Sequence, residues 1–153
     1  MKYFKIIPNC SGFGFEIEKQ KKTFLQSSYY KGYCKIESLC YEFDIFPDED
    51  IVCGSREIYL VSEVLKNVLL ITDLSGFSID VVKFQYSLNY QYFHPDKQNL
   101  QYHWLKIHGL AGETDFGLTE RYELVISEKA LYFLKQFNIE TIEIEPYSCS
   151  SSV

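Results

Sequence analysis

The sequence predicts a single α+β domain, built mainly from antiparallel strands with two or three helices packed on them. Three observations lead to this prediction. The chain has 153 residues, the length of one ordinary domain and enough to bury a sizeable core. Aromatic residues make up 17% of it, with 13 Tyr and 12 Phe, and flat rings pack well on pleated sheets. Many short segments alternate apolar and polar residues, whereas two segments change to a helical period. We expect residues 1–147 to form the domain and residues 148–153 to be a flexible tail.

The first third of the chain predicts strands separated by turns. Residues 1–7 and 15–18 alternate as half-buried strands do, and residues 41–46 alternate apolar with acidic side chains, which predicts an exposed strand. Residues 29–33 predict a turn through Gly32. The acidic run at residues 47–50 begins with proline and therefore predicts a turn after the third strand.

Two later segments carry the signals of a helix N-terminus. Ser62 and Ser127 each follow a short apolar strand and precede a glutamate. Serine is a favoured N-cap, and an acid in the first turn complements the positive end of the helix dipole. Apolar residues then recur at helical spacing. Asn138 predicts a left-handed C-cap for the second helix.

The remaining chain predicts further strands, at residues 79–86, 87–95, 101–107, 122–126 and 139–145. The second of these would complete a hairpin, with Asn89 near the turn. Residues 109–117 predict an acidic loop punctuated by glycines, and Pro146 is expected to end the last strand.

The two capped helices lie in similar surroundings. The separation from Ser62 to Ile79 equals the separation from Ser127 to Ile144. Each serine follows an apolar strand, and each isoleucine begins or continues another. An internal duplication and two ordinary units that share good capping chemistry are equally compatible with this pattern. Neither unit has the glycine-rich loop of a nucleotide site.

Charge and cysteine content exclude several classes of protein. The net charge is −6, so a general basic field for nucleic acid is absent. The five cysteines are an odd number with no Cys-x-x-Cys pair, which indicates free thiols in a reducing cytoplasm. No N-terminal stretch is typical of a signal peptide, and no apolar run approaches a membrane span. We therefore expect a cytoplasmic protein that binds neither nucleic acid nor membrane.

The residues do not predict an active site. His103 and His108 would face opposite sides of a regular strand, and His94 precedes a proline, so a shared metal is not expected. Cys53 follows an acidic turn, which would raise its thiol pKa and disfavour a nucleophile. We expect no enzyme activity, no cofactor and no metal. A hydrolase using scattered carboxylates or Cys53 remains one alternative.

Two groups of side chains are candidates for contact with a partner. Acidic runs can pair with Lys and Arg of a protein, although the usual role of such runs is a solvated turn. Aromatic residues on strands can anchor an interface, or stack ligands or single-stranded bases, which gives a second alternative function. The candidates are Asp48, Glu49, Asp50, Glu113 and Asp115 among the acids and Tyr90, Tyr92 and Trp104 among the aromatics.

Residues 102–146 resemble a group of bacterial immunity proteins encoded beside polymorphic toxins. The similar pattern consists of the strand WLKI at 104–107, the loop DFGL at 115–118, the segment LVISEKAL at 124–131, and a final strand closing at Pro146. The resemblance covers about the last third of the chain, with a weaker echo at residues 60–82. Some relatives carry paired Cys-x-x-Cys motifs, which this chain lacks.

The resemblance implies a protein that binds and neutralises a cognate toxin by stoichiometric contact. Such a protein needs a rigid complementary surface and no catalysis. Carboxylates would steer a basic toxin, such as a nuclease, and exposed tyrosines would supply anchor area. Asp115 and Phe116 become interface candidates through this resemblance. We expect a monomer or a homodimer.

Overall fold

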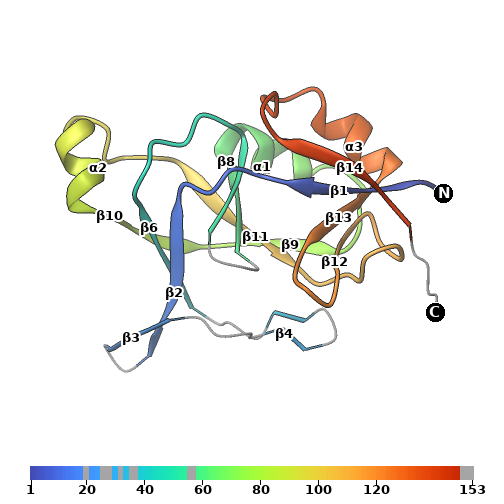
Figure 1. Cartoon of the computed structure of the whole chain (residues 1–153), viewed down its shortest axis with the longest axis horizontal. Helices are drawn as coiled ribbons and strands as arrows, with labels where there is room; N and C mark the ends of the chain where they lie inside the picture. Colours follow the sequence, from blue (N-terminus) through green and yellow to red (C-terminus); the bar gives the residue numbers. More distant parts are fainter. Residues whose placement is uncertain (19–20, 25–28, 31–32, 35–37, 55–57, 149–153) are drawn as a thin grey trace.

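Figure 1 shows the computed structural model of the chain, which describes residues 1–18, 21–24, 29–30, 33–34, 38–54 and 58–148. The α+β class is confirmed: within these residues, three helices accompany three four-stranded sheets and one short strand pair. All strand pairs are antiparallel except β10 with β6. No helix in the described part of the chain is long and apolar enough to cross a membrane.

The elements have the following bounds. The first sheet has the order β7 (Ile51–Cys53), β8 (Tyr59–Ser62), β11 (Tyr102–Ile107), β9 (Phe77–Asp80). The second has the order β12 (Phe116–Leu118), β13 (Leu124–Ser127), β1 (Tyr3–Ile7), β14 (Glu143–Tyr147). The third has the order β10 (Val82–Tyr86), β6 (Leu39–Phe43), β2 (Gly12–Glu18), β3 (Lys21–Phe24). Strands β4 (Tyr29–Tyr30) and β5 (Tyr33–Cys34) pair with each other, and the helices are α1 (Glu63–Leu69), α2 (Leu88–Phe93) and α3 (Glu128–Leu134).

The first and second sheets are built from the same unit. Residues 50–80, the first repeat, contain β7, β8, α1 and β9, and residues 115–145, the second repeat, contain β12, β13, α3 and most of β14. Ile51 pairs with Val61 in the first, and Phe116 pairs with Ile126 in the second, so corresponding residues are 65 positions apart throughout. The matching registers favour duplication over shared capping chemistry.

In each of these two sheets, one of the two inner strands comes from outside the repeat, and we call it the central strand. Strand β1, which precedes the first repeat, lies in the sheet of the second repeat, and β11, which precedes the second repeat, lies in the sheet of the first. Their registers also match. Leu105 of β11 pairs with Ile79, and Ile6 of β1 pairs with Ile144, the residue that corresponds to Ile79. Neither repeat can therefore complete its sheet without a strand from the part of the chain that precedes the other repeat.

One hydrophobic core joins both repeats. Alternate residues of the central strands, including Ile6 and Leu105, are buried in it together with the apolar faces of α1 and α3. Each helix begins at the predicted serine: Ser62 Oγ accepts from Leu65 N, and Ser127 Oγ accepts from Ala130 N. These caps satisfy backbone N–H groups that the first helical turn leaves free.

A second, aromatic-rich core lies between the first sheet and the third. Its fully buried members include Tyr41, Phe43, Tyr90 and Trp104. The ring centroids of Tyr41 and Phe43 are 4.8 Å apart with an edge-on geometry, which is favourable for aromatic pairs. Figure 1 shows the third sheet and α2 at one end of the molecule, away from α3 and β14. The third sheet is thus an addition to the first repeat.

The predicted hairpin strand at residues 87–95 is wrong, because this segment contains helix α2. Ser87 is its N-cap, with Oγ accepting from Tyr90 N at 3.0 Å and donating to Asp44 Oδ1 at 2.6 Å. The aromatic content suggested a strand, but the serine cap and the burial of Tyr90 against the second core override that weak local preference.

The strand predicted at residues 41–46 exists as β6 but is not exposed. Cys40, Tyr41 and Phe43 are all buried, because β6 lies between β10 and β2 and contributes to the second core. The position of β6 inside the sheet decides this burial. The alternation of apolar and acidic residues along the segment indicates an exposed strand and carries no information about the neighbouring strands.

Several predicted boundaries also differ. Val81 divides residues 79–86 between β9 and β10. Helix α3 ends at a right-handed cap on Lys135, and Tyr122 is the one non-glycine residue with positive φ in the described part of the chain, so Asn138 is not a left-handed cap. Pro146 lies inside β14, which is an edge strand and can therefore accommodate a residue without an N–H. The turn predicted at Gly32 lies outside the described residues.

Candidate functional site

The two acidic loops predicted to bind a partner occupy equivalent positions in the two repeats. Asp48 and Asp50 precede β7, and Glu113 and Asp115 precede β12 at the corresponding positions. Each aspartate next to the strand lies 12 residues before the serine that caps the helix of the same repeat. Asp50 and Asp115 therefore occupy equivalent positions both in the sequence and in the fold.

Asp50 connects the first repeat to the second. Its Oδ1 accepts from Ser62 Oγ at 2.7 Å, and its Oδ2 accepts from the backbone N–H of Asn138 at 2.7 Å. The backbone of the two loops pairs as well, because Asp50 N donates to Asn138 O at 3.0 Å. The carboxylate therefore fixes its own helix cap and the turn that follows α3.

Asp115 makes the reciprocal connection. Its Oδ1 accepts from Ser127 Oγ at 2.6 Å, and its Oδ2 accepts from Ser75 N at 2.9 Å and Ser75 Oγ at 3.2 Å. Ser75 belongs to the first repeat. Hydrogen bonds to a charged acceptor are stronger than neutral ones, so both aspartates are structural clamps between the repeats.

A cleft opens beside the clamp at Asp50. It has a volume of about 420 Å³ and lies between the chain that follows β1, the acidic turn before β7, and the turn after α3. Among the residues that the structure describes, it is lined by Asn9, Cys10, Ser11, Ile45, Phe46, Asp48, Glu49, Val52, Asn138, Glu140 and Thr141. Three of these carry carboxylates and none is a lysine or arginine, so the cleft is acidic.

Glu49 is the most constrained of these carboxylates, at 5% exposure. Oε1 accepts from Asn9 Nδ2 at 2.6 Å, and Oε2 accepts from Thr141 N at 2.9 Å. Both donors are neutral, and within the described residues no lysine, arginine or histidine forms an ion pair with Glu49. A buried carboxylate held only by neutral donors retains a strong attraction for a cation.

The other two carboxylates of the cleft face solvent. Asp48 and Glu140 are exposed, and neither side chain has an ion pair or hydrogen bond within the part of the chain that the structure describes. The backbone around them is nevertheless fixed, since Asn138 Nδ2 donates to Asp48 O at 2.7 Å. These two side chains can therefore meet an approaching positive charge without losing an existing contact.

The thiol-bearing residue Cys10 lines the cleft, and Cys53 lies opposite it in an isolated β-bridge. A hydrogen bond from the Cys53 thiol lowers the pKa of Cys10, an effect that partial burial opposes. The same hydrogen bond and burial raise the pKa of Cys53. The described residues contain no group of three His, Cys, Asp or Glu side chains arranged to hold a metal.

The predicted aromatic contacts need correction. Tyr90, Trp104 and Phe116 are each 0% exposed, because the first two lie in the second core and the third lies in the first. Their rings are inaccessible to a partner in this fold. Tyr92 differs, since it is 80% exposed on α2.

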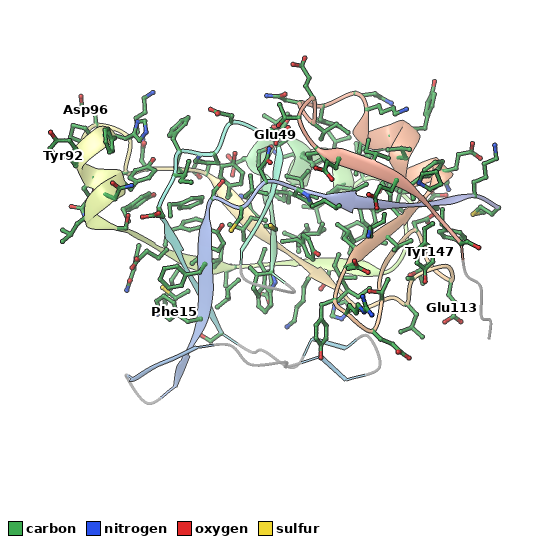
Figure 2. All side chains as sticks on the ribbon, viewed as in Figure 1. Phe15, Glu49, Tyr92, Asp96, Glu113 and Tyr147 are labelled. Atoms are coloured by element: carbon green, nitrogen blue, oxygen red, sulfur yellow. The ribbon has the colours of Figure 1, made fainter. Side chains whose placement is uncertain are left out.

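The accessible candidates do not converge on one surface. Figure 2 places Glu49 near the middle of the molecule, Tyr92 at the end that carries α2, and Glu113 near the opposite end. The structure instead brings Asp48 and Glu49 together with Asn9, Cys10 and Glu140, which sequence reasoning did not assign to a site. Their separation along the chain left no local signal, and Glu140 lay within the strand predicted at residues 139–145.

Comparisons with protein families, with curated proteins and with solved structures found no match.

Proposed function

We propose that this protein is an immunity protein that neutralises a cognate toxin domain by stoichiometric binding, and that the acidic cleft receives a basic segment of that toxin. The observation that carries the proposal is Glu49, a buried carboxylate that lines the cleft and has neutral hydrogen-bond donors but no described cationic partner. A lysine or arginine of the toxin would supply the missing positive charge.

The geometry supports tight binding because the cleft is preorganised. Asn9 Nδ2 also donates to Thr141 Oγ1 at 2.7 Å, and Tyr102 Oη donates to Glu49 O at 2.6 Å. The segments that form the walls are therefore held before a partner arrives. Groups that are already ordered lose little conformational entropy on binding.

The surface charges support fast and selective association. Asp48 and Glu140 would attract a basic partner over several ångströms, and the net charge of −6 acts in the same direction. The resemblance of residues 102–146 to immunity proteins of polymorphic toxins supports the same class of partner. A basic nuclease domain fits this chemistry.

The test compares charge reversals at two positions of the cleft with a charge reversal at Glu113, the position of the second repeat that is equivalent to Asp48. The full chain and its Asp48→Lys, Glu140→Lys and Glu113→Lys variants would be titrated with the toxin domain encoded beside its gene. We expect Asp48→Lys and Glu140→Lys each to weaken binding by about tenfold or more, with a smaller effect in high salt. Glu113→Lys is the matched control and should leave the affinity nearly unchanged.

The outcomes separate the parts of the proposal. Neutralisation of the toxin with equal effects of all three reversals would place the contact outside the cleft. Failure of the chain to bind or neutralise the toxin would remove the immunity function itself. Base stacking on the aromatic strands has less support, because Tyr90 and Trp104 are fully buried.

A further inference from the structure

Cys10 and Cys53 lie directly opposite each other in an isolated parallel β-bridge. Cys53 N donates to Asn9 O at 3.0 Å, and Ser11 N donates to Cys53 O at 3.4 Å, so the two hydrogen bonds flank Cys10. Neighbouring strands are about 4.8 Å apart, and opposed residues of a parallel pair point to the same side. This separation falls within the range of about 4.4–6.8 Å between the Cα atoms of a disulfide.

The two thiols differ in accessibility. Cys10 is exposed and lines the acidic cleft, whereas Cys53 is half-buried. The Cys10 thiol contacts Gly12 O at 3.0 Å, and the Cys53 thiol contacts Pro8 O at 3.3 Å. A reagent in solution can therefore reach the Cys10 thiol more easily than the Cys53 thiol, which lies opposite it.

We propose that Cys10 and Cys53 form a thiol-modification site that reacts with small-molecule disulfides, in which Cys10 attacks the reagent and Cys53 resolves the product to an intramolecular disulfide. The hydrogen bond from Cys53 that lowers the pKa of Cys10 increases the thiolate fraction of the attacking group near neutral pH. The inference is independent of the proposed toxin binding.

The exchange balances in two steps. The Cys10 thiolate forms a bond to one sulfur of the reagent while the S–S bond of the reagent breaks, and the other half leaves as a thiolate that takes a proton from water. Cys53 then gives its proton to water and attacks Cys10 Sγ, which forms the protein disulfide and expels the second half as a thiolate. The two cysteines lose two electrons, and the reagent is reduced to two thiols.

The first step of the exchange makes it easier for Cys53 to ionise in the second step. The hydrogen bond to Cys10 is the largest cause that raises the pKa of Cys53, and the charge of the Cys10 thiolate adds to it. Both disappear once Cys10 is bonded to half of the reagent. Cys53 then ionises more readily, next to the sulfur that it attacks.

The test uses oxidised glutathione as the disulfide and the full chain carrying Cys34→Ser and Cys149→Ser, so that the bridge thiols and Cys40 remain. Cys40 is buried, at 1% exposure, and serves as the internal control. Intact mass should show the loss of two hydrogens, and peptide mapping should find Cys10 joined to Cys53. With Cys53→Ser added, the reaction should stop with one glutathionyl group on Cys10. With Cys10→Ser added, oxidation should be lost.

A second measurement does not depend on those variants. The rate of Cys10 alkylation by iodoacetamide, followed against pH in the same parent chain, should have its midpoint below the ordinary thiol value of about 8.5. An ordinary or higher midpoint would overturn the assignment of Cys10 as the attacking group. A stable mixed disulfide on Cys10 in the presence of native Cys53, in a chain whose circular dichroism shows that it is folded, would overturn the role of Cys53.

Discussion

The outer faces of the two repeat sheets carry different residues at equivalent positions. In the first repeat sheet, Trp104 of the central strand lies in the second core under the third sheet. The corresponding residue of the second repeat sheet is Lys5, whose Nζ lies 3.2 Å from both Glu123 Oε2 and Glu145 Oε2. Glu123 itself corresponds to the fully buried Ile58 of the first repeat.

The inner faces, in contrast, are alike. Leu105 and Ile6 correspond, as do Val61 and Ile126, and all four are buried in the shared core. The unit thus keeps its apolar inner face in both repeats, whereas Trp104 and Ile58 of the outer face under the third sheet are replaced by Lys5 and Glu123 in the second repeat sheet. The difference shows that the pairing pattern defines the repeat, and that the outward side chains decide whether another layer can pack on it.

The largest expected effect comes from removing the side chain at the outward central position. Trp104→Ala should lower the free energy of unfolding by about 3–5 kcal/mol, because it opens a cavity in the second core. Lys5→Ala, the matched change, should cost a small fraction of that, because its ion pairs are solvent-accessible. Urea unfolding followed by circular dichroism measures both. Equal costs would contradict the difference between the outer faces.

The next effect tests whether the two aspartate clamps are equivalent. Asp50→Ala and Asp115→Ala should each cost about 2 kcal/mol, because each removal leaves donors in both repeats without their charged acceptor. Asp48→Ala and Glu113→Ala, two residues earlier in each repeat, should stay within about 0.5 kcal/mol of the parent chain. The same urea titrations compare all four. A negligible loss of stability on substitution of either aspartate would contradict the equivalence of the two clamps.

The helix caps should give a smaller effect with a defined order. Ser62→Ala and Ser127→Ala should each cost about 1 kcal/mol, the usual value of an N-cap. Ser127 should cost more, because it is fully buried whereas Ser62 is half-buried, and a buried serine leaves its partners less accessible to water. Thermal unfolding of the two variants side by side gives the order. The reverse order would indicate that burial does not set the cap strength here.

The smallest effect concerns an ion pair that one repeat interface has and the other lacks. Lys129 Nζ lies 3.0 Å from Asp73 Oδ1, whereas the corresponding positions hold Val64 and Asn138. The hydrogen bond and charge of Lys129 lower the pKa of Asp73. The pair should therefore stabilise the fold above the unfolded Asp pKa of about 3.9, and lose that contribution as pH falls through the lower folded value. The small stability difference between the parent chain and Lys129→Ala should vanish at low pH and shrink in salt. A difference that persists in acid would have another cause.

Local sequence determined the elements whose signals are short-range. Ser62 and Ser127 were identified as N-caps because a serine followed by an acid and a helical apolar period is sufficient to start a helix. The equal spacing of the two units was also visible along the chain. The aromatic segment at residues 87–95 was misread because Tyr and Phe favour strands on average, and because its local Ser87 cap is not followed by an acid in the first turn. The burial of Tyr90 in the second core depends on contacts distant in sequence.

Only the tertiary structure decided which residues meet. Asp50 and Asn138 lie far apart along the chain yet share two hydrogen bonds, and the carboxylate of Glu49 accepts hydrogen bonds from Asn9 and Thr141, which are also distant in sequence. The exchange of β1 and β11 between the repeat sheets follows from strand pairing over long separations. The sequence by itself determined periodicity and capping, because these depend on neighbours within one helical turn or strand. Register, burial and the acidic cleft depend on how the whole core closes, and therefore appear only in the folded chain.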